Sequence, residues 1–344
     1  VLDRYGPRTV VSVMGLFTGL SLVLTSYTAA SWQLFITYSL LLAVGTGAGF
    51  TVVTATASRW FVKKRGLAVG IGSSGEGLGA LVMAPFAIHL ISSFGWRIAF
   101  TVMGLITGVL MVSLSRLLRK TPGEIGAVPD GVKAAPGETA VPDKSGHGQP
   151  VSFSLTEAFR TRSFWFLGTI WLIYSLCYHL VVTHIVPHVT DVGITAVRAA
   201  TVLALIGGTN MLGRLVMGSV SDRIGRKMSG VICGLLQVAS MIWVAWSQEL
   251  WMFYLFAAVY GFGFGGLSTS TTALVSDIFG VGSLGAITGA LVIGFSLGAA
   301  LGPFIGGVIF DVSNNYFMAF LAGALAMLIV VLLLALIRRE DEPK

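Results

Sequence analysis

The chain alternates between long apolar runs and short polar interruptions along almost all of its 344 residues. The runs are about 20 residues long, which is the length that a helix needs to cross the hydrocarbon core of a bilayer. Strands of a membrane barrel would be shorter and would alternate apolar with polar positions. The pattern therefore predicts an all-α, polytopic membrane bundle. Its ten expected spans are 9–29, 33–57, 66–90, 96–118, 163–187, 196–220, 229–247, 250–275, 284–310 and 315–337.

The composition supports this prediction. Hydrophobic residues make up 55% of the chain, charged residues make up 11%, and the mean hydropathy is +0.85. These values exclude an ordinary soluble globular domain. The 44 glycines would weaken helices in water, but in lipid small residues let helices approach closely, as at the spacing of Gly294 and Gly298. We expect most of the glycines to serve helix packing.

The positions of lysine and arginine predict the orientation. If the first residues are cytoplasmic, 19 of the 22 basic residues fall on that side, including the cluster 59–65 and the segment 116–162. Arg97 and Arg198 fall on the other side. Because basic loops stay in the cytoplasm, we expect both termini there, in a multi-pass protein of the plasma membrane that is surrounded by the lipid bilayer. The net charge of +7 is then a signal of topology and needs no nucleic acid partner.

The sequence does not contain the motifs of several other functional classes. Cys177 and Cys233 both fall within predicted spans, and no cysteine spacing predicts a disulfide or a metal site. No phosphate-binding loop, nucleophile elbow or metalloprotease motif occurs. We therefore expect neither an enzyme nor an ATP-driven pump, and we expect no cofactor and no bound metal.

A short motif occurs twice. The stretches "DRYGPR" (3–8) and "DRIGRK" (222–227) are each followed by four predicted spans. Two further spans precede the second copy and none precedes the first, so we expect two helices to be absent from the first bundle. The predicted organisation is a partial four-helix bundle at 1–118, a flexible cytoplasmic linker at 119–162, and a six-helix bundle with a short tail at 163–344.

These repeated loops resemble the motif between the second and third helices of each half in the major facilitator superfamily. The segments "RWFVKKRGLAVGIGSSGEGLG" (59–79), "FGWRIAF" (94–100) and "LGPFIGGVIFDVSNNYFMAF" (301–320) are similar to its monocarboxylate transporter and oxalate/formate antiporter branch. The resemblance implies twelve helices, of which this chain is expected to lack the first two, and alternating access between two bundles. It implies a role in cytoplasmic gating for Asp3, Arg4, Gly6, Arg8, Asp222, Arg223, Gly225 and Arg226.

Arg214 lies inside the apolar stretch "GGTNMLGRLVMGSV" (207–220). An arginine at membrane depth costs about 2.5 to 3.5 kcal/mol even on a lenient insertion scale, so we expect this side chain to face the bundle interior. A guanidinium matches a carboxylate with two parallel hydrogen bonds. Asn210 lies one turn earlier and could donate its amide to the same anion. In the resembled family, the eighth helix carries a carboxylate-binding arginine with a polar residue one turn before it, which implies that Asn210 and Arg214 bind substrate.

Two residues are candidates for proton coupling. Glu76 is the one acidic residue inside a predicted span. It fits equally well as a proton carrier and as a buried structural partner of a polar or basic group on another helix. An ion pair between Glu76 and Arg214, which substrate would displace, is a hypothesis. His179 is a weaker candidate, as a pH sensor.

The predicted span 163–187, which carries His179, and the residues just after it also contain Tyr174, Tyr178, His184 and His188. The last two are four residues apart and would suit two metal ligands, but further ligands are not evident. We therefore favour residues of the membrane interface or of a gate. Tyr260 in "YGFGFGG" and Phe50 in "GTGAGF" are candidates to enclose the apolar part of a small acid. Aromatic filling between closely packed helices is an equally good interpretation of both.

The sequence predicts secondary transport of a small monocarboxylate such as lactate, pyruvate or formate. Arg214 is the one lysine or arginine well inside a predicted span, which favours one carboxylate. The stretch "LGAITGALVIGFSLGAALGPF" also has no lysine at the place where members of the resembled family that handle dicarboxylates carry one. We favour symport with a proton over anion exchange of the oxalate/formate type. A facilitator of drugs or sugars would need more polar helices. A non-transporting membrane remnant is a further alternative, because two absent helices would open the site to lipid. No oligomeric state is predicted.

Overall fold

The computed structural model describes residues 2–61, 64–126 and 153–337, of which 76, 77, 80, 81, 84, 85 and 88 are described as helix backbone only. Throughout this part the chain is helical, and it contains no strand. The elements are α1 (Leu2–Ser26), α2 (Ser31–Leu34), the π-helix η1 (Phe35–Leu41), α3 (Leu42–Thr46), α4 (Gly49–Trp60), α5 (Arg65–Ser115), the 3-10 helix η2 (Pro122–Ile125), α6 (Leu155–Phe159), α7 (Arg162–Asp191), α8 (Ala196–Ile224), α9 (Arg226–Ala245), α10 (Leu250–Phe279), α11 (Leu284–Ser313) and α12 (Phe317–Leu336).

Within the described residues, nine helical segments are long and apolar enough to cross a membrane. They coincide with nine of the ten spans expected from the sequence. The other expected span, 66–90, lies within α5, where several side chains are outside the described part. The predicted all-α membrane fold is thereby confirmed, and the exact number of spans stays a prediction.

The chain forms two compact units. Unit 1 comprises Val1–Val62 and Leu78–His147, and unit 2 comprises Lys63–Gly77 and Gly148–Lys344. The helix α5 runs from one unit into the other, because its first turns pack in unit 2. The domain boundaries expected from the sequence remain a prediction, since packing and not chain order defines these units.

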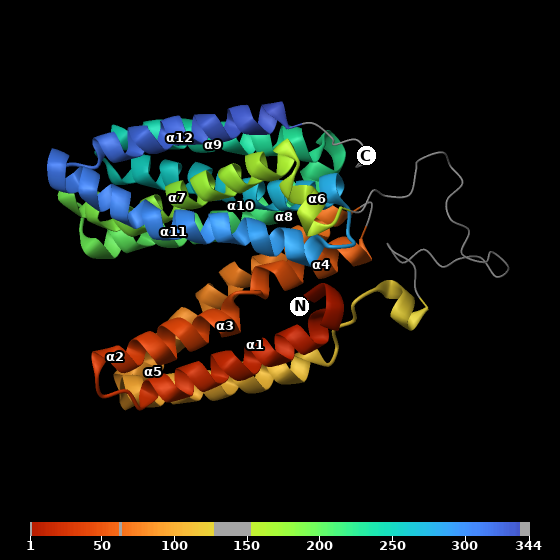
Figure 1. Ribbon diagram of the computed structural model, residues 1–344. Helices are drawn as coiled ribbons and strands as arrows, with labels where there is room; N and C mark the ends of the chain where they lie inside the picture. The colour runs from red at the N-terminus through yellow and green to blue at the C-terminus, as the bar shows by residue number, and fades with distance from the viewer. Residues whose placement is uncertain (1, 62–63, 127–152, 338–344) are drawn as a thin grey trace. The chain divides into compact units, whose positions relative to one another are not determined.

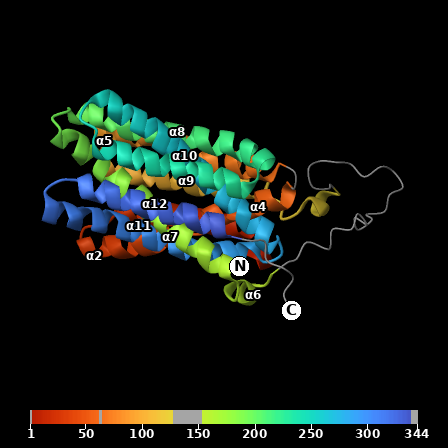
Figure 2. The ribbon, with the colours of Figure 1, turned by 90° about the horizontal axis from the view of Figure 1, so that it is seen from above.

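Unit 2 contains the six long helices α7 to α12, which run side by side (Figure 1, Figure 2). In it α8 packs against α10, α7 packs against α11, and α9 contacts both α10 and α12. Glycine permits the closest of these approaches. A Cβ atom on Gly298 of α11 would lie 2.8 Å from the main-chain nitrogen of Leu176 on α7. Gly298 thus serves the helix packing that was expected of it.

Unit 1 pairs α1 with the later part of α5. A Cβ atom on Gly19 would lie 2.9 Å from the carbonyl oxygen of Gly104, and the hydroxyls of Ser12 and Ser115 are 2.7 Å apart. Gly95, with φ of 80°, interrupts α5 before this part begins. Small residues therefore bring these two helices into direct backbone contact.

The repeated motif folds alike in both units. Gly6 has φ and ψ of 78° and 169°, and Gly225 has 91° and 146°. Residues with a side chain avoid this positive φ region. In each copy the glycine turn follows the Asp-Arg pair of the motif and precedes the next helical stretch. That stretch begins at Pro7 in the first copy and at Arg226 in the second. The glycine of the motif is thus required by its backbone conformation.

Candidate functional site

Arg214 is buried inside unit 2, with 5% of its surface exposed, as expected from the cost of an arginine that faces lipid. Its Nε donates to Asn210 Oδ1 at 3.0 Å, and its Nη1 donates to the main-chain oxygen of Ser73 at 3.0 Å. Arginine has donors only, so the atom of Asn210 that faces it must be the amide oxygen. The amide nitrogen of Asn210 therefore keeps its two hydrogens for another acceptor.

The backbone around Arg214 is held between two other helices. A Cβ atom on Gly265 of α10 would lie 2.9 Å from the nitrogen of Arg214, and one on Gly70 of α5 would lie 3.2 Å from its carbonyl carbon. Neither neighbour could carry a side chain without displacing α8. The position of the guanidinium is therefore fixed by packing as well as by hydrogen bonds.

An aromatic cluster formed by α7, α10 and α11 begins at Phe264, one residue before the Gly265–Arg214 contact. Phe264, which precedes Gly265, stacks on Tyr178 with ring centroids 3.8 Å apart, and the centroid of Tyr174 lies 5.5 Å from it. Phe295 on α11 contacts Tyr174 at 5.6 Å and His179 at 5.8 Å. Phe264 and Phe295 were not among the residues selected from the sequence. The signal for Phe264 was present, since it belongs to the same glycine-rich motif as Tyr260.

The two aromatic residues selected from the sequence lie in different units. Tyr260 on α10 is fully buried in unit 2 and stacks on Phe256 at 5.2 Å. Its hydroxyl has no hydrogen-bond partner among the residues that the structure describes. Phe50 is half-buried on α4 of unit 1. A role of either residue in substrate binding stays a prediction.

Of the two candidates for proton coupling, the structure describes the side chain of one. His179 Nδ1 lies 2.9 Å from the main-chain oxygen of Ser175, four residues earlier. A carbonyl oxygen only accepts, so Nδ1 carries the hydrogen and Nε2 is the basic nitrogen of the ring. Glu76 belongs to α5, but its side chain lies outside the described part of the structure.

The two outer histidines of α7 have separate surroundings. His184 Nε2 donates to the main-chain oxygen of Pro303 at 2.9 Å. His188 is buried, and its ring contacts Phe253 and Phe320 at centroid distances of 5.5 and 5.0 Å. No group of three or more potential metal ligands occurs in the part of the chain that the structure describes.

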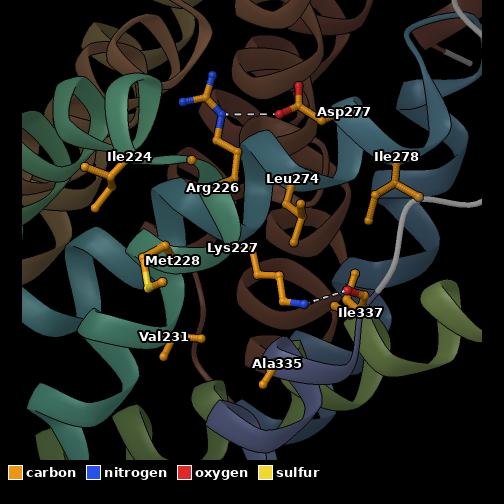
Figure 3. A pocket seen from close by; sticks show the side chains of 11 residues that line it. Ile224, Arg226, Lys227, Met228, Val231, Leu274, Asp277, Ile278, Ala335 and Ile337 are labelled. Atoms are coloured by element: carbon orange, nitrogen blue, oxygen red, sulfur yellow. Dashed lines mark hydrogen bonds and ion pairs between the residues drawn. The ribbon is translucent and has the colours of Figure 1, made fainter.

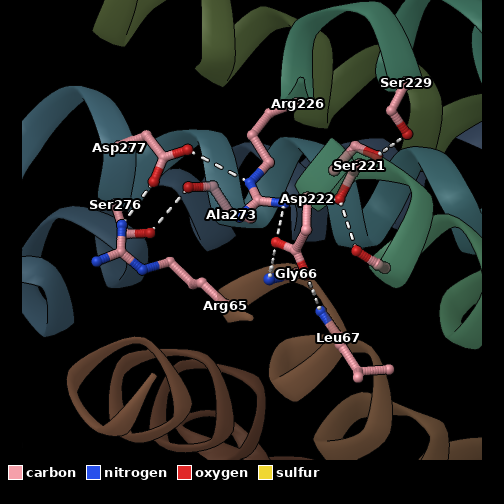
Figure 4. A network of polar contacts seen from close by, with 12 residues as sticks. Arg65, Gly66, Leu67, Ser221, Asp222, Arg226, Ser229, Ala273, Ser276 and Asp277 are labelled. Atoms are coloured by element: carbon pink, nitrogen blue, oxygen red, sulfur yellow. Dashed lines mark hydrogen bonds and ion pairs between the residues drawn. The ribbon is translucent and has the colours of Figure 1, made fainter. Parts of the chain in front are cut away.

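The second copy of the repeated motif holds the start of α5. Asp222 accepts hydrogen bonds from the main-chain nitrogens of Gly66 at 3.0 Å and Leu67 at 3.1 Å, and it forms an ion pair with Arg226 (Figure 4). The first N–H groups of a helix have no partner within the helix, and the helix dipole favours a negative charge there. The carboxylate of Asp222 therefore caps α5.

Asp277, in the last turn of α10, joins two arginines of this network. Its Oδ1 lies 2.5 Å from Arg65 Nη1 and its Oδ2 lies 3.3 Å from Arg226 Nε (Figure 4). The guanidinium-bearing side chains are mostly buried, at 12% and 10% exposed. Asp277 was not among the residues selected from the sequence, because no lysine or arginine nearby in the sequence marks it as part of a charge network.

The first copy of the motif forms a simpler network in unit 1. Asp3 Oδ1 pairs with Arg59 Nη2 at 2.5 Å, and Lys120 Nζ donates to the main-chain oxygen of Asp3. The remaining arginines of the two motifs, Arg4, Arg8 and Arg223, are exposed. The structure thus joins the acids of both motifs to basic partners, whereas the gating role of the eight motif residues stays a prediction.

Long apolar helices, a repeated turn motif and the buried Arg214 define a polytopic helical membrane protein with two related halves. The model of the Major Facilitator Superfamily matches residues 1–247 and 209–344. The chain therefore belongs to the major facilitator superfamily, which is a family of transporters. This confirms the family resemblance seen in the sequence and the expectation that the chain is not an enzyme.

The relatives also match the expected branch. Human monocarboxylate transporter 11 is 30% identical over 329 residues, which are 92% of this chain and 66% of that protein. The oxalate:formate antiporter of Oxalobacter formigenes is 30% identical over 286 residues, 81% of this chain and 63% of that protein. The chain thus spans about two thirds of the length of these relatives. The crystal structure of the Escherichia coli fucose:proton symporter has the same fold, with a TM-score of 0.75 at 15% identity over 99% of this chain and 85% of that one.

Proposed function

We propose that the chain is part of a secondary transporter that moves a small monocarboxylate, such as lactate, pyruvate or formate, together with a proton by alternating access. The observation that carries this proposal is the buried guanidinium of Arg214 beside Asn210, in the interior of unit 2. The site needs no cofactor. We further propose that the protein lies in the plasma membrane with both termini in the cytoplasm, because its basic loops fall on that side.

A carboxylate fits this site by charge and by geometry. A guanidinium can offer a carboxylate two parallel N–H groups, and the amide nitrogen of Asn210 can add a third donor. Gly265 lies against the backbone of Asn210 and Arg214, and its sequence neighbour Phe264 stacks on Tyr178, so these two rings are the proposed apolar wall of the site. A low-dielectric wall strengthens the attraction between the ions and favours a short apolar acid over a sugar.

A single carboxylate is the favoured ligand. Arg214 is the one lysine or arginine in the sequence that lies well inside a predicted span, so a second carboxylate would lack a matching cation. The names of the relatives support a carboxylate as cargo, because they are a monocarboxylate transporter and an oxalate:formate antiporter.

Proton coupling makes the movement of a monocarboxylate electroneutral. His179 is a candidate carrier because its Nε2 is the basic ring nitrogen within the aromatic cluster, and Glu76 is the second candidate. Exchange of two anions is the alternative mechanism, and the relation to the oxalate:formate antiporter favours it. Exchange would need no titrating side chain.

The motif network is proposed to act as a cytoplasmic gate. Asp222 and Asp277 hold the first turn of α5, and the same helix continues into unit 1 after Gly77. Release of this turn would let α5 move relative to α8. Alternating access requires contacts of this kind that form and break.

The test uses the full-length protein in proteoliposomes and measures the uptake of labelled lactate under an inward proton gradient. Arg214→Gln removes the charge, and Arg198→Gln removes an exposed charge from the first turn of the same helix as the matched control. We expect uptake that depends on the gradient in the wild type and in the control, and at least a tenfold loss in Arg214→Gln.

The other outcomes discriminate between the alternatives. Uptake that requires a carboxylate inside the liposomes, and ignores the gradient, would favour exchange over symport. Equal uptake by Arg214→Gln and the control would overturn the role of the buried arginine. No transport of any monocarboxylate by a folded wild type would favour a facilitator of another substrate or a non-transporting membrane protein.

A further inference from the structure

Unit 2 contains a concave site at the end where α9 begins and where α8, α10 and α12 end. The cavity has a volume of about 570 Å³ (Figure 3), which is within the range of small-molecule sites. Its walls are apolar side chains from four helices, among them Ile224, Val231, Leu274 and Ala335. The charged side chains Arg226, Lys227 and Asp277 also line it.

This cavity is separate from the site around Arg214. Ile224, the first residue of the cavity lining, is ten positions after Arg214 on α8, which is about 15 Å along a helix. Because four spans begin or end around it, the cavity lies at the level of the membrane surface and not at the midplane. A ligand there would contact the headgroup region and the outermost part of the hydrocarbon core.

The charges of the cavity favour an anion. Arg226 forms ion pairs with Asp222 and Asp277. Lys227 Nζ donates to the main-chain oxygen of Ile337 at 3.0 Å. A carbonyl group does not neutralise the ammonium, and Lys227 forms no ion pair within the described residues. The side chain is also exposed. Lys227 can therefore present its positive charge and its remaining hydrogens to a phosphate.

The apolar walls decide which anion fits. A soluble phosphate would gain nothing from Val231, Leu274 and Ala335, whereas an acyl chain would bury its methylene groups against them. Basic pockets between transmembrane helices on the cytoplasmic side bind acidic lipid headgroups. We propose that this cavity binds one anionic phospholipid, with its phosphate on Lys227 and the start of an acyl chain against the apolar wall. The proposal concerns a lipid site and does not depend on which substrate is transported.

The experiment measures lipid retained by the full-length protein. The protein is reconstituted into vesicles of equal phosphatidylglycerol and phosphatidylcholine and then extracted in mild detergent, and the bound lipids are counted by mass spectrometry. Lys227→Gln removes the proposed phosphate ligand. Arg162→Gln removes an exposed charge at the start of α7, at the same end of unit 2 and outside the cavity lining, as the matched control.

We expect the wild type and Arg162→Gln to retain phosphatidylglycerol in preference to phosphatidylcholine. One basic residue near an anionic surface contributes about 1 kcal/mol, so Lys227→Gln should lower the retained phosphatidylglycerol about fivefold. Ala335→Trp fills the cavity without changing its charge and should also lower the amount of retained phosphatidylglycerol. All variants must elute as the wild type does in size-exclusion chromatography, which separates lost binding from lost folding.

Three results would overturn the proposal. The first is equal retention of the two lipids by the wild type. The second is an equal effect of Lys227→Gln and Arg162→Gln. The third is displacement of the retained lipid by millimolar inorganic phosphate, which would show a site for small anions.

A further experiment, deletion of 338–344, tests whether that segment occupies the cavity instead of a lipid. We expect unchanged retention, and lipid binding that occurs only after the deletion would contradict the proposal.

Discussion

Arg214 donates a hydrogen bond from Nη1 to the main-chain oxygen of Ser73, 3.0 Å away, and so ties the middle of α8 to the first turns of α5. The same guanidinium is the proposed ligand of the substrate carboxylate. A carboxylate is a stronger acceptor than a carbonyl group and would compete for this hydrogen. Substrate binding would then weaken one link between α8 and α5, which provides a physical route from binding to a change of conformation.

The first prediction tests this link through Gly70. A Cβ atom there would lie 3.2 Å from the carbonyl carbon of Arg214, so Gly70→Ala should force α5 away from α8 and stretch the Arg214–Ser73 bond. Overpacking of this kind costs about 1 to 3 kcal/mol. We expect a lower melting temperature in detergent and a lower rate of lactate uptake.

Gly207→Ala on α8 is the control for Gly70→Ala. No atom lies within 4 Å of a Cβ atom built at this position. Alanine also favours a helix over glycine by about 1 kcal/mol. Its melting temperature should stay at or above that of the wild type. Equal losses in the two variants would mean that glycine itself, and not the α5–α8 contact, matters.

The second prediction concerns Asn210. Asn210→Leu keeps the branched shape of the side chain but removes the oxygen that accepts from Arg214 Nε at 3.0 Å. A hydrogen bond to a charged group contributes about 1.5 to 3 kcal/mol, so the guanidinium should lose its fixed orientation. We expect KM for lactate to rise at least tenfold. Leu212→Ala, at an exposed position of the same helix, should leave KM unchanged. An unchanged KM in Asn210→Leu would exclude a role of Asn210 in substrate binding.

The sequence predicted the helices and the burial of Arg214, because both follow from local facts. An apolar run of about 20 residues must span the membrane, and a charge within it must avoid lipid. The partner of Nη1 could not be predicted, since the main-chain oxygen of Ser73 has no signature in the sequence. Asp277 was missed for a related reason. Its partner Arg65 lies 212 positions earlier, and no local pattern links residues at such a distance.

The aromatic cluster shows a different limit of the sequence. Tyr260 and Phe264 lie one turn apart on α10 and have similar neighbours in the sequence. In the structure, α7 places Tyr178 on the ring of Phe264, whereas Tyr260 stacks on Phe256 of its own helix. Periodicity assigns residues to a helix face, but the choice between two successive turns depends on which helix packs against that face.

The third prediction concerns Asp277 and its two arginines. Asp277→Asn leaves Arg65 and Arg226 near each other without their shared carboxylate, so like charges would repel in a largely buried site. We expect a melting temperature that is lower by several degrees. Asp311→Asn, at an exposed position of α11, should not change it. In a double-mutant cycle, Arg65→Gln should cost less in the Asp277→Asn background than in the wild type. Additive effects would contradict direct coupling of the pair.

The fourth prediction is a pH dependence outside the membrane spans. Glu157 forms a capping box at the start of α6, where its carboxylate accepts from the main-chain nitrogen of Ser154 at 2.7 Å. This hydrogen bond, followed by one with the Ser154 side chain, holds the pKa of Glu157 below its ordinary value. A depressed pKa stabilises the folded helix above the ordinary carboxyl pKa, and this stabilisation is lost as the pH falls through the depressed pKa.

Hydrogen exchange of α6 can measure this effect. The main-chain amides of α6 should exchange faster, relative to their intrinsic rates, as the pH falls through the carboxyl range. Glu157→Gln retains an acceptor but does not titrate, so its protection should be lower at neutral pH and independent of pH in this range. The same acid-induced loss in Glu157→Gln would exclude Glu157 as its cause.

The fifth prediction decides between the two interpretations of Tyr260. Its hydroxyl is fully buried and has no hydrogen-bond partner among the described residues. A buried polar group without a partner costs about 1 to 3 kcal/mol. Tyr260→Phe should therefore raise the melting temperature of the substrate-free protein, and if the hydroxyl binds lactate it should also raise KM. Tyr254→Phe on the same helix is the control, because the Tyr254 hydroxyl already has Thr201 Oγ1 at 2.8 Å and its removal should give no gain in stability. A stabilised Tyr260→Phe with unchanged KM would assign Tyr260 to helix packing and leave the aromatic side of the proposed site to Phe264 and Tyr178.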